Sequence, residues 1–193
     1  MDHDAFEISR RQFIVDSAVL GGGLAVGLVS PGASAADAAA ELNVWVVIKP
    51  DDTCVIRIAR SEMGQGTLTG LAQLVAEELE CDWRKVTTES ITPGQNYAAK
   101  RAWGEMGTGG SRGIRMSHDY VRRAGAAARL MLVQAAADEL KVPVAELRAV
   151  NGTVAHALSG RSLRYGQLAP AAAKLTPPDS KSIQLKDPHT WKV

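Results

Sequence analysis

Residues 54–79, CVIRIARSEMGQGTLTGLAQLVAEEL, contain the strand-to-helix junction from which the fold can be worked out. Apolar and β-branched residues dominate 54–59, a pattern typical of a strand. The junction itself is Glu62-Met63-Gly64-Gln65-Gly66. The following residues predict an amphipathic helix from about Thr67 to Glu80, because apolar residues recur there at helical spacing: Leu68, Leu71, Leu74, Val75 and Leu79.

Two further apolar runs flank this region. Residues 42–48 are separated from 54–59 by Lys49-Pro50-Asp51-Asp52-Thr53, whose proline and aspartates are typical of a turn. These features predict a β-hairpin, and residues 86–91 predict another strand after the helix. The order is β-β-α-β, which we interpret as an α+β fold with a mixed sheet and not as a parallel βαβ unit.

The second half of the chain is predicted to contain a long helix, a hairpin and a last short helix. A long glycine-containing loop over 92–110 leads into a long Ala-rich helix over about 111–140. Asn151-Gly152 is a strong hairpin signal, and residues 166–175 predict a last short helix. Prolines leave an extended tail over 176–193, which we expect to lead into a following domain. The long helix is expected to face the core through Ile114, Val121, Ala128, Met131 and Leu132.

The composition excludes several classes of protein. The 193 residues carry 22 Lys and Arg against 21 Asp and Glu, a balance that argues against a nucleic-acid-binding face. Two cysteines cannot build a disulfide framework, a four-cysteine zinc site or an iron–sulfur cluster. Whether Cys54 and Cys81 pair is left open. No apolar run reaches the ~18 residues expected of a membrane-spanning helix.

The first 35 residues have the features of an export signal. Arg10-Arg11 precedes Phe13-Ile14 and a nearly uncharged stretch, and Ala33-Ser34-Ala35 offers small residues for a signal peptidase. The paired arginines resemble the twin-arginine signal, whose route carries folded proteins, usually with a cofactor already inserted. We expect a periplasmic protein, membrane-associated if the signal is kept, with a linker over 36–41. The alternative is a short amphipathic helix, which Gly21-Gly22-Gly23 disfavours.

The first candidate binding segment is the junction Glu62–Gly66. Its glycines permit positive φ and close approach of a ligand, Gln65 can donate and accept hydrogen bonds, and a helix N-terminus favours an anion. The alternative is a plain strand-to-helix turn. The full dinucleotide-binding fingerprint is absent, because no third glycine follows at the spacing that it requires.

The second candidate segment is Gly107-Thr108-Gly109-Gly110-Ser111-Arg112-Gly113, which also enters a helix. Backbone amides, two hydroxyls and an arginine converge there, as expected of a site for phosphate or pyrophosphate. The alternatives are a glycine-rich connector in which Ser111 caps the helix, and a site for the phosphate of a nucleotide. No Gly-Lys-Ser/Thr sequence is present, so this segment is not a P-loop.

Other chemistry-bearing residues are explained by packing. His118 and His156 have no partner at metal-ligand spacing, so the sequence predicts no metal site formed by side chains. Tyr97 and Trp103 lie in the long loop and are candidates to face a substrate, although packing explains Trp103 equally well.

Together, Glu62–Gly66, the β-β-α-β order and Thr108–Arg112 before an Ala-rich helix resemble the molybdopterin-binding large subunits of the xanthine dehydrogenase and aldehyde oxidase family. The resemblance is greatest to the exported branch of isoquinoline 1-oxidoreductase β subunits and membrane-associated aldehyde dehydrogenases. Members of that branch have a twin-arginine start and a stretch similar to residues 159–168, SGRSLRYGQL. Residues 42–175 are then expected to form the N-terminal part of the molybdopterin-binding domain.

The resemblance implies a molybdenum hydroxylase that oxidises aldehydes or N-heteroaromatic compounds with molybdopterin cytosine dinucleotide. Electrons would leave through iron–sulfur clusters on a small partner subunit, and often then through a cytochrome c. Glu62 would orient the small-molecule substrate. The cofactor would be held by Gly64, Gln65, Gly66, Thr108, Gly109, Gly110, Ser111 and Arg112.

Large subunits of this family are several times longer, and their glutamate base lies near the distant C-terminus. We therefore expect this chain to act with the remaining large-subunit chain or domains and to be inactive alone, because proton abstraction needs a positioned base. The alternative is a non-catalytic exported binding or assembly module that retains the scaffold. The enzymatic hypothesis requires Gln65 and Ser111 to lie on the same side of the molecule.

Overall fold

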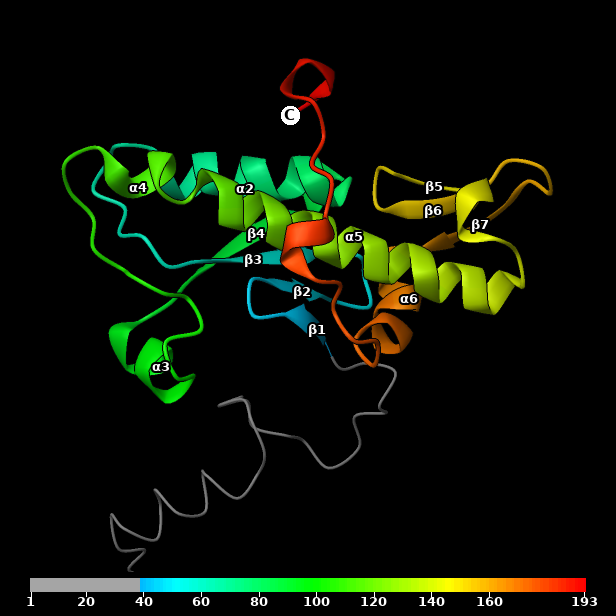
Figure 1. Cartoon of the computed structure of the whole chain (residues 1–193), viewed down its shortest axis with the longest axis horizontal. Helices are drawn as coiled ribbons and strands as arrows, with labels where there is room; N and C mark the ends of the chain where they lie inside the picture. The colour runs from blue at the N-terminus through cyan, green and yellow to red at the C-terminus, as the bar shows by residue number, and fades with distance from the viewer. Residues whose placement is uncertain (1–38) are drawn as a thin grey trace, which may run out of the picture. The chain divides into compact units, whose positions relative to one another are not determined.

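A computed structural model describes residues 39–193 as two sheets packed with helices (Figure 1). The predicted export signal over 1–35 lies outside the described residues. A four-stranded sheet has the order β1-β2-β3-β4 and a three-stranded sheet the order β5-β6-β7. In chain order the elements are β1 (Ala40–Asn43), β2 (Val46–Ile48), β3 (Cys54–Ile58), α2 (Thr67–Leu79), η1 (Trp83–Lys85), β4 (Val86–Ser90), α3 (Pro93–Ala98), α4 (Arg112–Arg115), α5 (His118–Leu140), η2 (Val144–Glu146), β5 (Leu147–Val150), β6 (Thr153–His156), β7 (Arg161–Arg164), α6 (Tyr165–Ala172), η3 (Ser180–Ser182) and η4 (Pro188–Thr190).

The apolar run over 42–48, predicted as one strand, is two strands. The Asn43 side-chain oxygen accepts hydrogen bonds from the amides of Trp45 and Val46, which turns the chain between β1 and β2. The prediction of one strand was wrong, because the run is apolar along nearly its whole length and the turn depends on the single asparagine within it. β1 also begins at Ala40, within the segment expected to be a linker. The predicted β2–β3 hairpin is confirmed.

The junction of residues 54–79 belongs to a parallel βαβ unit, contrary to our interpretation. β4 pairs with β3 in parallel, in a register that runs from Cys54 opposite Val86 to Ile58 opposite Ser90. α2 is the crossover between the two strands, and a connection of this length permits parallel pairing. The sheet as a whole is mixed, as predicted, because β1, β2 and β3 are antiparallel.

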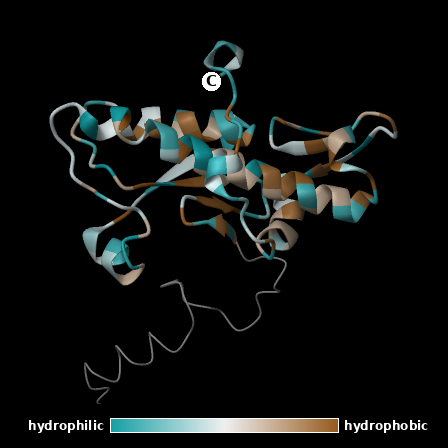
Figure 2. Cartoon of the chain, in the orientation of Figure 1, coloured by the Kyte–Doolittle hydropathy of each residue, from teal (hydrophilic) through white to brown (hydrophobic). Residues whose placement is uncertain are grey.

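The core lies between the four-stranded sheet and the helices α2, α5 and α6. β2 is buried along its whole length, whereas β3 alternates, with Cys54, Ile56 and Ile58 turned inward. Figure 2 shows these two strands as the most hydrophobic part of the sheet. α2 and α5 approach closely at Gly125, where an added Cβ would lie 2.5 Å from the carbonyl oxygen of Val75.

The predicted long helix over 111–140 is two helices, α4 and α5, separated at Met116 and Ser117. The buried Ser117 hydroxyl accepts hydrogen bonds from Arg60 Nε at 3.0 Å and from the Tyr120 hydroxyl at 2.7 Å. The prediction of one continuous helix was wrong, because Ser117, where the helix breaks, is held by hydrogen bonds to distant parts of the chain that the local sequence does not show. The loop predicted over 92–110 also contains α3, which the Thr92–Gln95 capping box initiates.

The hairpin predicted at Asn151-Gly152 is confirmed, with positive φ at both residues. A third strand, β7, extends this sheet and was not predicted. The last helix, α6, follows directly. Asp52 in the β2–β3 turn accepts a hydrogen bond from the Gly166 amide, which ties α6 to the four-stranded sheet.

The tail over 176–193 is mostly without regular structure, as predicted, and it packs on its own chain. Lys186 Nζ donates to Glu80 at 2.8 Å, and the amides of Lys192 and Val193 both donate to Glu77 at 2.9 Å. The Arg122 guanidinium lies 5.0 Å from the centre of the Trp191 ring. No helix within residues 39–193 is long and apolar enough to cross a membrane.

Candidate functional site

The two glycine-rich segments lie side by side, as the enzymatic hypothesis requires. The Ser61 amide donates to Thr108 Oγ1 at 2.9 Å, and an added Cβ at Gly113 would lie 3.0 Å from Thr67 Oγ1. In Figure 1 both segments lie at the end of the four-stranded sheet that is remote from β5, β6 and β7. The structure therefore brings together residues that are more than forty positions apart in the sequence.

Arg60 joins the two segments and was missed by sequence reasoning. It follows β3, and only 5% of its surface is exposed. Its guanidinium donates to the Gly107 carbonyl and to Ser117 Oγ, so one side chain ties the end of β3 to the second loop and to the start of α5. An arginine directly after an apolar strand was the available signal, but its partners are distant in sequence.

Glu62 closes the first segment by binding its backbone. One carboxylate oxygen accepts from the amides of Gly64 at 2.7 Å and Gly66 at 3.0 Å, and the other accepts from Leu68 at 2.8 Å. Its carboxylate therefore occupies the N-terminal end of α2 that the sequence offered to an anion. The predicted role of Glu62 in orienting a substrate stays a prediction.

We expect the first segment to loosen in acid. The amides of Leu68 and Gly66 hold the pKa of Glu62 below its ordinary value of 4.5. A carboxyl group with a lowered folded-state pKa stabilises the fold above its ordinary pKa, and that contribution is lost as the pH falls through the lowered value. In an NMR titration, the amide resonances of Gly64, Gly66 and Leu68 should shift together with a midpoint below pH 4.5. Glu62→Gln should abolish this common transition, and three unrelated midpoints would contradict the assignment.

Gln65 also binds within its own segment. Its amide nitrogen donates to the Ser61 carbonyl and to Thr67 Oγ1, both at 2.8 Å, and its amide oxygen accepts from the Met63 amide. The side chain is exposed all the same, so a ligand in contact with this loop can reach its amide group.

The second segment presents groups that the fold leaves available. Ser111 has a φ of 56° and no side-chain capping bond, so the alternative in which its hydroxyl caps a helix is wrong. The Arg112 side chain is 45% exposed; its Nε donates to the Gly109 carbonyl at 3.3 Å, and a terminal nitrogen lies 3.8 Å from the Glu105 carboxylate. Because α4 has only four residues, the dipole of a long helix does not act at Ser111, contrary to our expectation.

Four glycines of the two segments border open space. An added Cβ would meet no atom within 4 Å at Gly64, Gly66, Gly109 or Gly110. Three of these glycines have positive φ, which disfavours any other residue there: Gly64, Gly66 and Gly110. A ligand can therefore approach the backbone of both loops.

The other candidate residues lie elsewhere or are buried. Trp103 packs with Ala59 and Ile91 and donates its indole N–H to the Val44 carbonyl, whereas Tyr97 is exposed. His156 is buried and bonded to Glu146 and Ser159. Within residues 39–193, no group of three His, Cys, Asp or Glu side chains could hold a metal ion.

Cys54 and Cys81 are free, buried thiols. A hydrogen bond with Cys81, together with burial, raises the pKa of the Cys54 thiol. The two cysteines, whose pairing the sequence left open, form no disulfide in this structure.

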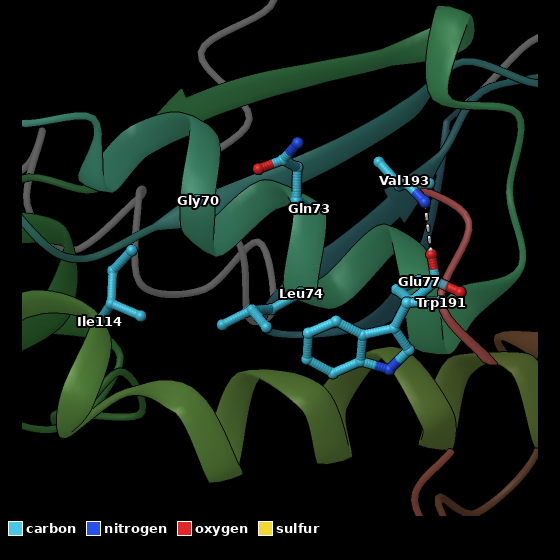
Figure 3. Close-up of a pocket in the computed structure, with 7 residues that line it drawn as sticks. All are labelled: Gly70, Gln73, Leu74, Glu77, Ile114, Trp191 and Val193. Atoms are coloured by element: carbon cyan, nitrogen blue, oxygen red, sulfur yellow. Dashed lines mark hydrogen bonds between the residues drawn. The ribbon is translucent and has the colours of Figure 1, made fainter. Parts of the chain in front are cut away.

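A cavity of about 190 Å³ lies between α2, α4 and the tail (Figure 3). Leu74, Ile114 and the Trp191 ring border it, and its one acidic residue, Glu77, is bonded to the Val193 amide. Cofactor sites are usually larger, about 300–1,000 Å³, and have several converging polar groups. The candidate site is therefore the pair of loops and not this cavity.

This βαβ-containing α+β fold with two adjacent glycine-rich loops is that of a molybdopterin-binding domain. The model of the molybdopterin cofactor-binding domain family matches residues 4–193, and the chain belongs to this family. The fold is also found in quinoline 2-oxidoreductase from Pseudomonas putida 86 (TM-score 0.50, 20% identity, 72% of this chain and 17% of that one) and in a Cu,Mo-CO dehydrogenase (TM-score 0.52, 23% identity, 65% and 15%).

Two curated relatives are closer in sequence. The isoquinoline 1-oxidoreductase subunit β of Brevundimonas diminuta is 37% identical over 174 residues, which are 86% of this chain and 22% of the relative. The membrane-bound aldehyde dehydrogenase (pyrroloquinoline-quinone) of Gluconacetobacter polyoxogenes is 32% identical over 193 residues, 93% of this chain and 24% of the relative. The chain thus spans about a quarter of the length of these relatives.

Proposed function

We propose that this chain contributes part of the cofactor pocket of a molybdenum hydroxylase that oxidises aldehydes or N-heteroaromatic compounds. The observation that carries the proposal is the contact between residues 61–67 and 107–113 in a chain of the molybdopterin-binding family. The names of the relatives, an isoquinoline oxidoreductase subunit and an aldehyde dehydrogenase, support the substrate classes.

The residues present fit a pterin cofactor with phosphate groups. An added Cβ at Gly109 or Gly110 would meet no atom within 4 Å, so a large planar or anionic group can reach the backbone there. Arg112 supplies a half-exposed guanidinium suited to two phosphate oxygens, and Ser111 has a hydroxyl that caps no helix. Gln65 is the polar side chain of the opposite loop.

When bound, molybdenum would supply the redox chemistry. This chain would bind and orient the cofactor: Arg112, Ser111 and Thr108 on its anionic groups, and Gln65 with its flanking glycines on the other side. Arg60 would hold the second loop in place beside the first through its hydrogen bonds to Gly107 and Ser117. Both carboxylate oxygens of Glu62 already accept hydrogen bonds from the amides of Gly64, Gly66 and Leu68. Glu62 would therefore orient a substrate only through the remaining acceptor capacity of these oxygens. The base for proton transfer would come from another polypeptide or domain.

Replacing Arg112 should weaken cofactor retention. In the assembled complex, Arg112→Ala should reduce affinity by at least about tenfold, because a hydrogen bond to a charged group contributes about 1.5–3 kcal/mol. Arg115→Ala is the matched control, since it removes the other arginine of the same short helix and should change retention little. Molybdenum per chain by elemental analysis, and pterin by fluorescence after oxidation, measure the result.

The same preparation identifies the cofactor form. Release of cytidine monophosphate on hydrolysis would support molybdopterin cytosine dinucleotide. Pyrroloquinoline quinone, which the name of one relative includes, is assayed in parallel. A complete complex without molybdenum or pterin would overturn the proposal.

The second candidate is a non-catalytic binding or assembly module, and the internal hydrogen bonds of Glu62 and Gln65 favour it. Glu62→Ala and Gln65→Ala separate the two functions. Turnover that is unchanged in the assembled complex would support the module, whereas a large loss would support a role in the pocket.

We further propose a periplasmic location, on the basis of the paired arginines at 10–11, and a small iron–sulfur subunit with or without a cytochrome c as electron acceptor. Peripheral membrane association belongs to the same proposal. Fractionation of cells that express the tagged chain, with Arg10→Lys and Arg11→Lys as the control, tests the location.

A further inference from the structure

β4 is the last strand of the four-stranded sheet, and its outer edge pairs with no strand within residues 39–193. The strand is five residues long and parallel to its one neighbour, β3. Parallel strands are normally covered on both faces, because their crossovers place helices over them. β4 departs from that arrangement.

The backbone groups that point to the open edge can be identified from the hydrogen bonds of the sheet. The Arg57 amide donates to Trp45, on the β2 side, and the Ile91 amide donates to Ile58, on the β3 side. Because the direction alternates along a strand, Thr87 and Glu89 face β3 as Ile91 does. Thr88, at the centre of β4, therefore presents its N–H and C=O groups to the open edge, and Ser90 does the same.

The side chains of β4 are less well covered than those of β3. Ile56 and Ile58 of β3 are fully buried, but their cross-strand partners on the same face, Thr88 and Ser90, are exposed. The sequence Val86-Thr-Thr-Glu-Ser90 has no proline or lysine to block pairing, and its one charge, on Glu89, is bonded to Arg57. Natural proteins usually protect such an edge.

We propose that β4 pairs along this edge with a strand from the remainder of the large subunit, the polypeptide that corresponds to the greater part of the relatives' length. The chain spans 22% and 24% of two relatives, so both relatives contain much polypeptide outside the matched region. The added strand would extend the sheet and cover Thr88 and Ser90. This inference rests on the proposed function, because it requires assembly with further large-subunit polypeptide.

Hydrogen exchange tests the pairing directly. The native complex, purified through a tag on this chain, is compared with the chain alone, with fragmentation that resolves single amides. The Thr88 and Ser90 amides should exchange at least about a hundredfold more slowly in the complex, whereas Thr87 and Glu89 should be slow in both samples. Cross-linking from the adjacent Lys85 identifies the polypeptide that supplies the strand.

Thr88→Pro removes the outward N–H and keeps the bonds to β3, and Thr88→Ala is the matched control that keeps the N–H. Thr88→Pro should weaken assembly at least about tenfold relative to Thr88→Ala. Proline lacks the N–H that would donate to the added strand, and its ring would obstruct the approach of that strand. Equal assembly of the two variants, fast exchange of Thr88 in the complex, isolation of the chain as a monomer, or cross-links to a second copy of this chain would each overturn the proposal.

Molybdenum content separates this inference from the proposed function. A complex that contains molybdenum but leaves Thr88 unprotected would refute the strand pairing alone. A complex that protects Thr88 but contains no molybdenum or pterin would refute the proposed function alone.

Discussion

Arg122→Ala is expected to destabilise the protein by about 3–5 kcal/mol, the cost of leaving one partner of a buried ion pair alone. Glu78 is fully buried within α2, and Arg122 of α5 donates to it through Nε at 2.9 Å and through a terminal nitrogen at 2.6 Å. The same terminal nitrogen donates to the Lys186 carbonyl at 2.5 Å. The substitution therefore leaves a carboxylate in the core and removes one of the hydrogen bonds that hold the tail.

Urea unfolding monitored by circular dichroism measures this loss. Arg84→Ala is the control, because the Arg84 side chain is exposed and forms an ion pair with the nearby Asp82. The urea midpoint of this variant should barely differ from that of the parent protein. The double variant Glu78→Leu with Arg122→Met should recover most of the stability, since apolar residues of similar volume replace the pair without a buried charge. Equal midpoints for Arg122→Ala and Arg84→Ala would refute the structural role of the pair.

Gly125→Val is the second large effect, a loss of about 3 kcal/mol or more from overpacking. The glycine lies where α5 crosses α2, and an added Cβ would meet the Val75 carbonyl oxygen at 2.5 Å and Glu78 Cβ at 3.2 Å. The first contact is with backbone, so the two helices must separate. In an unobstructed helix, replacing glycine by alanine would stabilise the protein by about 1 kcal/mol. Gly125→Ala therefore tests whether the clash of the added Cβ with α2 outweighs this gain in helix propensity.

Gly109→Val is the control for this prediction, because no atom lies within 4 Å of an added Cβ there. Thermal unfolding should show a clearly lower midpoint for Gly125→Val and a nearly unchanged one for Gly109→Val. A Gly125→Ala variant more stable than the parent would show that the helices are farther apart than in this structure.

Local sequence signals predicted the elements that depend on neighbouring residues. α2, the β2–β3 hairpin and the turn at Asn151-Gly152 follow from apolar spacing and turn residues, and the structure confirms them. The break between α4 and α5 was not predicted, because its cause is the bond from Arg60 to Ser117, 57 positions away. The parallel direction of β4 was also missed.

The candidate site shows the same division. Its residue types and the two glycine-rich segments were found from sequence, and the resemblance to molybdopterin-binding subunits agrees with the family match. Arg60 was missed, because its hydrogen-bond partners, Gly107 and Ser117, are distant in the sequence and come close to it only in the folded protein. The part played by Glu62 in closing its own loop was missed as well, since three backbone amides converge on it only in the folded turn.

The sequence by itself determined α2, the β2–β3 hairpin, the turn at Asn151-Gly152 and the position of the two glycine-rich segments, because these features depend on side-chain pattern and backbone conformation within a few residues. Only the tertiary structure decided that residues 61–67 contact 107–113, that the tail binds to Glu77 and Glu80, and that the edge of β4 is open within the part of the chain described. Contacts between distant residues depend on how the whole core packs, and local sequence pattern carries little information about that packing.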